Sequence, residues 1–303
     1  MKCPHCGQEH PDNFQFCPVT GQKLISQLKA CTNKQCPDFG KYILPLESKF
    51  CPSCGQQLED TKSKVNDVMT FSVDGVSFNM ILVEHGSFMM GAMVEHEEPC
   101  EDETPVHKVS ITKNYYMGET QVTQALWTAV MGNNPSRFKG HDRPVESIKW
   151  GECQKFVKNL NNRLRFNLDG KQFRLPTEAE WEFAARGGIR SKGYLYAGSN
   201  NIDEVAWYYG NSGGETHPVA KLKSNELGLY DMSGNVKEWC QDWYGRYQEN
   251  AQTNPMGLAY GEYHVFRGGG EGYEPEMCRL SCRSGGTIDL TLFCLGFRLA
   301  LSD

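Results

Sequence analysis

Two cysteines near the C-terminal end, Cys278 and Cys282, stand four residues apart in the segment MCRLSCRSGG (277–286). Their residue type fits four roles: a catalytic thiol pair, a disulfide, metal ligands or packing. A strand places residues i and i+4 about 13 Å apart, and only a helix or a tight loop brings such a pair together. The glycines and arginines around them do not indicate a helix, which argues against two thiols that act as a pair.

Cysteines at the other end of the chain have the spacing of zinc ligands. The second of two similar units has the pattern Cys-x4-Cys…Cys-x2-Cys, formed by Cys31, Cys36, Cys51 and Cys54. Four thiolates complete a tetrahedral zinc site. A unit this short has almost no core, so the metal must supply much of its folding free energy.

The first unit has an incomplete set of zinc ligands. Its three cysteines are Cys3, Cys6 and Cys17. Thr20 stands where a fourth cysteine would be, so His5 or His10 completes the shell, or the site is weak or empty. Neither unit is strongly basic, which favours partner docking or a capping role over binding to nucleic acid.

Composition restricts the class of protein. The 303 residues carry a formal net charge of −6, with 39% hydrophobic and 22% charged residues. This balance is that of a globular protein and argues against a nucleic-acid or anionic-membrane surface. No apolar run approaches the roughly 20 residues of a membrane span. The polar start, MKCPHCGQEH, predicts no signal peptide and a reducing cytoplasmic location, in which disulfides are a poor default for the 13 cysteines.

The chain divides by pattern into four parts. Polar residues in 56–69 indicate a tether, and the predicted parts are a ribbon with an incomplete ligand set (1–24), a zinc ribbon (25–57), a linker (58–72) and a large domain (73–303). Alternation in 70–91 predicts short strands, and helical spacing marks 123–132 and 150–164. Thr177 and Glu180 form a capping box before a helix that ends at Gly187-Gly188.

The rest of the large domain has little periodicity. It is rich in Gly, Asn, Asp, Trp and Tyr. So much irregular chain is compatible with a compact domain only if ions or dense side-chain hydrogen bonding hold it.

Several long motifs, in order, resemble the formylglycine-generating-enzyme or sulfatase-modifying-factor family. They include FRLPTEAEWEFAARGG (173–188), NELGLYDMSGNVKEWCQDWYG (225–245) and LGFRLAL (295–301). The resemblance covers about 75–303. It implies an α+β, C-type-lectin-like fold with much irregular structure. Members include copper oxidases that make formylglycine, ergothioneine-synthase-like iron enzymes, and non-catalytic binding proteins such as the variable proteins of diversity-generating retroelements.

The resemblance also implies a calcium loop within DMSGNVKEW. Its ligands would be the Asp231 side chain, the Gly234 and Val236 carbonyl groups and the Glu238 carboxylate. Calcium prefers six to eight hard oxygen ligands and accepts backbone carbonyls. The alternative is that Asp231 and Glu238 only cap backbone amides.

Catalysis by the family's oxidases depends on two copper-binding cysteines near the GFR ending. Counted back from Gly296, those positions fall on Leu280 and Pro275, and neither is a thiol. Cys278 matches a Cys-Arg position found in non-catalytic relatives. The histidines are scattered and lack the three-histidine set of the iron enzymes. No catalytic residue is therefore assigned.

The segment 284–294 is unusual for the family. Its Ile288, Leu290 and Leu292 form either one more half-buried strand or a rewritten surface. Retroelement mutagenesis acts on adenines, and every residue type in 284–294 can be reached from asparagine codons. Glu271, Glu276 and Met277 cannot be reached in this way.

These observations together predict a cytoplasmic bacterial ligand-binding protein without catalysis, of the retroelement-variable type. The alternatives are a formylglycine-generating oxidase and a zinc-ribbon adaptor or effector. The expected partner is a protein or another macromolecule, not a membrane. The expected cofactors are structural zinc and calcium. The predicted contact residues are Glu271, Tyr273, Glu276, Ser284, Thr287, Ile288, Leu290, Leu292 and Phe293.

The zinc assignment predicts that a fragment spanning 25–57 binds one zinc ion through four sulfurs at about 2.3 Å each. Metal analysis by mass spectrometry should find one zinc per fragment, and a chelator should unfold it because metal binding and folding are coupled. A fragment that remains folded in chelator would contradict the assignment.

Overall fold

The computed structural model describes residues 29–30, 35–36, 42–43, 53–54, 59–60, 67–92 and 100–302. The chain divides into two compact units, Met1–Asn66 and Asp67–Asp303. In the first unit a small antiparallel sheet has the order β2-β1-β3, with β1 at Lys29–Ala30, β2 at Tyr42–Ile43 and β3 at Glu59–Asp60. Five predicted zinc ligands lie outside the described residues: Cys3, Cys6, Cys17, Cys31 and Cys51.

The large unit begins with a five-stranded sheet of order β4-β5-β8-β15-β9. Its strands are β4 (Val68–Val73), β5 (Val76–Val83), β8 (Tyr115–Gly118), β9 (Gln172–Arg174) and β15 (Ala300–Ser302). Strand β4 starts five residues before the predicted domain start at 73. The reason is that Val68 already pairs with Ile81 across the β4–β5 hairpin, so part of the predicted linker is sheet.

Three α-helices form where the sequence predicts them: α1 (Gln124–Met131), α2 (Trp150–Leu164) and α3 (Glu178–Ala185). Helix α2 presents its apolar side chains to the core, as the helical spacing requires. At the start of α3 the Thr177 hydroxyl accepts a hydrogen bond from the Glu180 N–H, and the Thr177 N–H donates to the Glu180 carboxylate. This confirms the predicted capping box.

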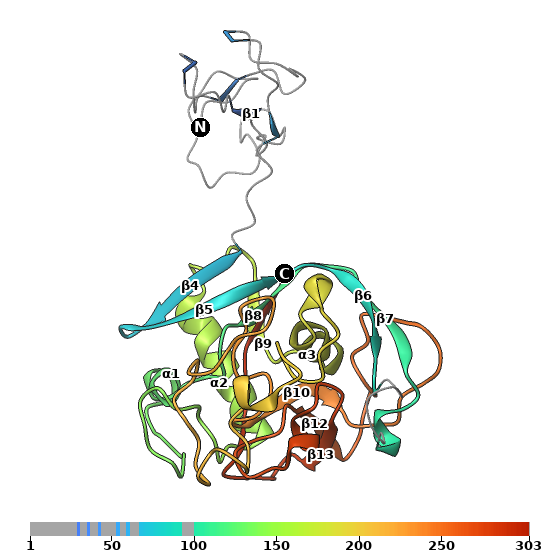
Figure 1. Cartoon of the computed structure of the whole chain (residues 1–303). Helices are drawn as coiled ribbons and strands as arrows, with labels where there is room; N and C mark the ends of the chain where they lie inside the picture. Colours follow the sequence, from blue (N-terminus) through green and yellow to red (C-terminus); the bar gives the residue numbers. More distant parts are fainter. Residues whose placement is uncertain are drawn as a thin grey trace. The chain divides into compact units, whose positions relative to one another are not determined.

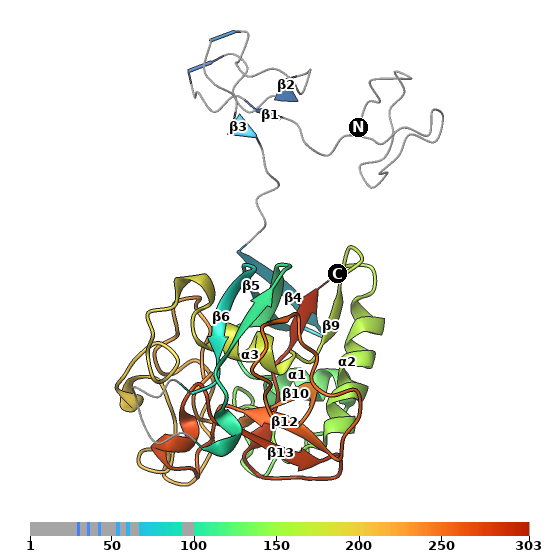
Figure 2. The ribbon, with the colours of Figure 1, turned by 90° about the vertical axis from the view of Figure 1, so that its right-hand side faces the viewer.

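Two further sheets complete the large unit. One has the order β13-β12-β10-β14 and the other β11-β7-β6. Figures 1 and 2 show β12 and β13 at the opposite end of the large unit from β4 and β5. The strands of these two sheets are β6 (Gly86–Met90), β7 (His107–Ile111), β10 (Lys237–Trp243), β11 (Gln252–Thr253), β12 (Tyr263–Arg267), β13 (Arg283–Thr287) and β14 (Leu295–Gly296).

Long stretches between these elements are irregular, as predicted, and contain four short 3-10 helices: η1 (Glu101–Glu103), η2 (Gly188–Arg190), η3 (Ile202–Glu204) and η4 (Pro275–Cys278). Side chains replace regular backbone pairing here. The buried Asn225 amide donates to the Ala184 and Ala185 carbonyls and accepts from the N–H groups of Leu227 and Leu229. Such bonding satisfies buried backbone groups that no sheet or helix satisfies.

The core of the large unit has two main clusters. The larger includes Trp127, Phe156 and Phe297, and the second includes Trp181 and Phe183. No helix in the described part of the chain is long and apolar enough to cross a membrane. The predicted α+β, C-type-lectin-like class with much irregular structure is confirmed, and the domain has few helices.

Candidate functional site

The predicted contact residues do not share one environment. Glu276, Thr287, Ile288 and Phe293 are exposed, whereas Glu271 is fully buried. The half-buried ones are Tyr273, Ser284, Leu290 and Leu292. Glu271 is therefore not a surface contact, because its backbone is tied to buried chain: its N–H donates to the Asn235 carbonyl and its carbonyl accepts from the Ser212 hydroxyl.

Of the two interpretations of Ile288, Leu290 and Leu292, the additional half-buried strand does not form in the described chain. Strand β13 ends at Thr287, and a turn closed by the Leu290 N–H and the Thr287 carbonyl follows. The Leu290 and Leu292 side chains pack onto the larger core cluster. The alternation of apolar residues thus arises from a loop that alternately touches the core and the solvent.

The exposed part of this loop adjoins a second segment of chain. The Phe293 ring lies 6.3 Å from the Phe138 ring, edge to face. The guanidinium of Arg137 lies over both rings, 5.0 Å from the Phe293 centroid and 5.2 Å from the Phe138 centroid. We call the set Arg137, Phe138, Ile288 and Phe293 the recognition patch. Sequence reasoning missed Arg137 and Phe138, because nothing in their local pattern links them to the C-terminal loop.

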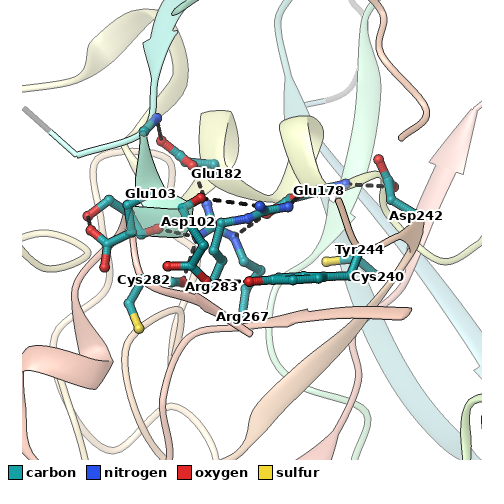
Figure 3. Close-up of polar contacts among 12 residues, drawn as sticks. Asp102, Glu103, Glu178, Glu182, Cys240, Asp242, Tyr244, Arg267, Cys282 and Arg283 are labelled. Atoms are coloured by element: carbon teal, nitrogen blue, oxygen red, sulfur yellow. Dashed lines mark hydrogen bonds and ion pairs between the residues drawn. The ribbon is translucent and has the colours of Figure 1, made fainter. Parts of the chain in front are cut away.

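Beneath β13, buried ion pairs join the C-terminal segment to α3 (Figure 3). Arg283 makes two hydrogen bonds of 2.7 Å to the Glu178 carboxylate. Arg267 pairs with Glu182 and lies 3.4 Å from Glu178. These arginines and carboxylates are all nearly inaccessible to solvent. Bidentate Arg–carboxylate geometry is strong and directional, so it fixes the register of β12 and β13 against the helix.

Arg267 and a third arginine, Arg279, also hold the irregular backbone that leads into β13. Arg267 donates to the carbonyls of Ser281 and Cys282. Arg279 makes two hydrogen bonds of 2.8 Å to Glu103 on η1. The chain between β12 and β13, 268–282, contains the short helix η4 and is fixed mainly by these charged side chains.

We call this network of buried arginine–carboxylate pairs the frame. The thiols of the C-terminal segment lie close to it. Cys278 packs with Tyr196, Val205 and Ala206, and Cys282 is 5% exposed. Burial raises the pKa of Cys278 to about 12 and that of Cys282 to about 11. Because the thiolate is the nucleophile and the metal ligand, these environments oppose reactivity at neutral pH. Leu280 is buried and Pro275 begins η4.

Beside these thiols lies a buried lysine that sequence reasoning missed. The Lys237 ammonium is 3.6 Å from the Tyr273 ring centroid and 4.8 Å from the Phe266 centroid. Burial lowers the pKa of Lys237, and three nearby thiols, foremost Cys294, act in the opposite direction. The cation–π contact thus holds the Tyr273 ring against the buried Lys237 ammonium.

Glu271 is the most unusual buried group of this region. Neither carboxylate oxygen has a hydrogen-bond partner among the described residues, and both oxygens are inaccessible. Burial raises the pKa of Glu271 to about 7; Glu146 also raises it, while the nearby backbone amides and Arg137 lower it. Those amides are close enough to act on the charge but are not placed for a well-formed hydrogen bond. Below pH 7 the group is therefore neutral, which limits the cost of its burial.

The predicted calcium ligands do converge, but around another side chain. The Gln121 amide nitrogen lies 3.3 Å from the Gly234 carbonyl, 2.8 Å from the Val236 carbonyl and 3.0 Å from the Glu238 carboxylate. The fourth oxygen is the Asp231 carbonyl at 3.1 Å. The Asp231 side chain, predicted as the ligand, instead accepts the Ala220 N–H at 2.8 Å.

These residues do not fit a calcium ion in this arrangement. The Gln121 amide stands at the point on which the oxygens converge. Glu238 is already neutralised by Arg298, which makes hydrogen bonds of 2.6 and 2.8 Å to its two oxygens, and it also accepts the Trp181 indole N–H. Within 67–92 and 100–302, no three His, Cys, Asp or Glu side chains group as metal ligands. The Gln121 amide and the Arg298 guanidinium donate hydrogen bonds to these oxygens in place of a cation.

Comparison with known proteins identifies the architecture. Residues 66–302 match the model of the sulfatase-modifying factor enzyme 1-like domain, and residues 3–55 match a double zinc ribbon. The chain belongs to the sulfatase-modifying factor family. This confirms the predicted resemblance, and the ribbon match supports structural zinc.

Individual relatives have different names. The chain is 34% identical over 240 residues to "Chaperone protein LppX" of Paenibacillus barcinonensis, covering 64% of this chain and 79% of that protein. It is 28% identical over 283 residues to the formylglycine-generating enzyme of Streptomyces coelicolor, covering 71% and 86%. Among solved structures, Treponema denticola variable protein 1 matches with a TM-score of 0.70 and 33% identity, covering 77% of this chain and 98% of that one.

The Gln121 arrangement predicts that calcium does not change the melting temperature of the wild-type protein. Gln121→Glu would place a second carboxyl group, beside that of Glu238, among the converging oxygens. We expect this variant to lose about 2–4 kcal/mol in EDTA and to regain stability when calcium binds the folded state. Melting curves with calcium and with EDTA test both points. A calcium-dependent rise in the wild type would restore the calcium site.

The Glu271 environment predicts a pH-dependent stability difference. The folded-state pKa of about 7 exceeds the ordinary value of 4.5, so stability falls as pH rises from 4.5 to 7. Glu271→Gln should be equal to wild type near pH 4.5 and more stable above pH 7, by up to about 3 kcal/mol. Urea unfolding at both pH values measures this. Exposed Glu276→Gln is the control, and an equal change in both variants would refute the assignment.

Proposed function

We propose that this protein binds a macromolecular ligand through the recognition patch and does not catalyse a reaction, in the manner of a retroelement variable protein. The similarity to Treponema denticola variable protein 1, which spans nearly all of that chain, supports this subtype. The deeply buried thiols support a role without catalysis.

The proposal rests mainly on one contrast: the strands on either side of the loop 288–293 are held by buried contacts, whereas two residues of the loop are exposed. On one side of 288–293, β13 is held by Arg283. On the other, β14 pairs in parallel with β10, at Leu295–Gly296. Between them, Ile288 is 50% exposed and Phe293 43% exposed, and neither contributes to the frame. Such a loop can change sequence while the fold is kept.

The chemistry of the patch suits a protein surface. Two aromatic rings, an aliphatic side chain and a guanidinium stacked on the rings resemble the centre of a protein–protein interface, where aromatic residues and Arg are enriched. The Arg137 guanidinium stacks on both rings and the residue is exposed, so its charge is available to a ligand. Asp289 of the same loop forms an exposed ion pair of 2.9 Å with Lys149, the residue that precedes α2.

Two other functions each have one supporting observation. Similarity to the formylglycine-generating enzyme of Streptomyces coelicolor favours an oxidase. The double zinc ribbon match at 3–55 favours an adaptor that docks a partner through its first unit. We place zinc there as a structural cofactor and assign the ribbons no catalytic part.

The loop arrangement predicts that a charge introduced at Phe293 and a charge introduced at Leu290 have different effects on stability. Phe293→Asp should change the free energy of unfolding by less than about 1 kcal/mol, because the residue is 43% exposed and lies outside the core clusters. Leu290→Asp should cost about 3 kcal/mol or more, because it forces a charge into the core. Urea unfolding of the two variants decides the point. If Phe293→Asp unfolds the domain, the loop is part of the frame and the proposed binding surface is wrong.

The absence of catalysis predicts no copper-dependent turnover. With copper(I) and a sulfatase-type cysteine peptide in air, the full chain should produce no aldehyde above the rate without protein. Cys282→Ser should alter only packing, by about 1–3 kcal/mol. Stoichiometric copper binding, with turnover that Cys282→Ser abolishes, would establish the oxidase instead.

A further inference from the structure

A separate cavity of about 190 Å³ lies where β7, the start of α3, the end of β10 and the loop 245–258 meet. Its walls include His107, Asp242, Trp243, Arg246 and Gln252. None of the predicted contact residues and none of the recognition patch lines it. A concave site with a few converging polar groups is the usual form of a small-molecule site.

The floor of this cavity contains a buried carboxyl group. Asp242 is 3% exposed, and one of its oxygens accepts the Glu178 N–H at 2.9 Å. Arg283 is the nearby cation, but its N–H groups are already bonded to the Glu178 carboxylate and to the carbonyls of Gly245 and Asp102. No charged partner therefore remains for Asp242 among the described residues.

As a result, Asp242 is a proton donor at neutral pH. Burial raises its pKa to about 8, Glu178 and then Glu180 act in the same direction, and Arg283 opposes them. Cys240, on the same strand, is neutral because its own pKa is raised well above its usual value. A carboxylic acid kept neutral in a cavity can donate a hydrogen bond to an oxygen of a ligand.

The rest of the cavity favours negative charge. Arg246 is exposed at its rim and has no carboxylate partner among the described residues. The amino-terminal end of α3, at Glu178 and Ala179, also borders the cavity. A helix N-terminus attracts anions. A cationic ligand would need Asp242 to ionise and would be repelled by Arg246.

We propose that this cavity binds a small organic carboxylate, held by an ion pair with Arg246 and by a hydrogen bond from the Asp242 carboxyl group. The site is independent of the recognition patch, so either assignment can fail without the other. Because binding requires the protonated form of Asp242, affinity should fall about tenfold between pH 7 and pH 9.

Calorimetry on the full chain with two probes of equal length tests this proposal. Succinate should bind at pH 7, and putrescine, the corresponding diamine, should not. Arg246→Gln should weaken succinate binding about tenfold or more, because it removes the ion pair. Asp242→Asn keeps a donor of similar shape, so it should bind within about threefold of wild type and lose the decrease between pH 7 and pH 9. Exposed Arg165→Gln is the control.

Three results would overturn the proposal. The first is no succinate binding up to about 10 mM, a concentration at which a specific site with an ion pair and a hydrogen bond should be occupied. The second is putrescine binding that Asp242→Asn abolishes, which would make the cavity a cation site. The third is succinate binding that Arg246→Gln and Arg165→Gln reduce equally, which would reflect general surface charge.

Discussion

The buried arginine–carboxylate pairs are the constraint on which the rest of this fold depends. Arg267 and Arg283 join β12 and β13 to Glu182 and Glu178 of α3, and Arg298 joins the last residues to Glu238. Each pair is costly to desolvate and remains stable only with full hydrogen bonding. Removing one partner leaves an unpaired buried charge, which costs about 3–5 kcal/mol. The frame is therefore directional and intolerant of change.

That intolerance has a functional consequence. The ion pairs that fix the fold are made by buried residues, whereas Ile288 and Phe293 are exposed. The family framework can then be kept while the exposed loop changes. The same frame borders the cavity at Asp242, where burial and the neighbouring Glu178 carboxylate raise the pKa of the Asp242 carboxyl group to about 8 and Arg283 opposes them. One network thus shapes both candidate binding sites.

The sequence predicted the elements whose patterns are local. The helix over 150–164 and the capping box at Thr177 and Glu180 follow from periodicity and neighbouring residues, and both are confirmed. The fold followed from motifs of a known family and is also confirmed. Contacts between residues distant in sequence were not predictable. Gln121 reaches the predicted calcium loop across 113 residues at Gly234, and no local pattern signals this.

Glu271 and Leu290 show a second limit of sequence reasoning. A charged residue in an irregular segment suggests exposure, yet the backbone bonds of Glu271 place it inside. Alternating apolar residues suggest a strand, yet a turn at Thr287–Leu290 produces the same alternation. In both cases tertiary contacts override local preference, which is expected where side chains rather than sheets hold the backbone.

Hydrogen–deuterium exchange of Glu178→Gln and the wild type tests the central role of the frame most directly. This change leaves the size of the side chain nearly unaltered and removes the charge that Arg283 and Arg267 share. The account predicts faster exchange in peptides covering 279–287, with the β4–β5 hairpin at 68–83 still protected, because local opening follows the loss of local contacts. Unchanged exchange over 279–287, or an equal increase in both regions, would contradict it.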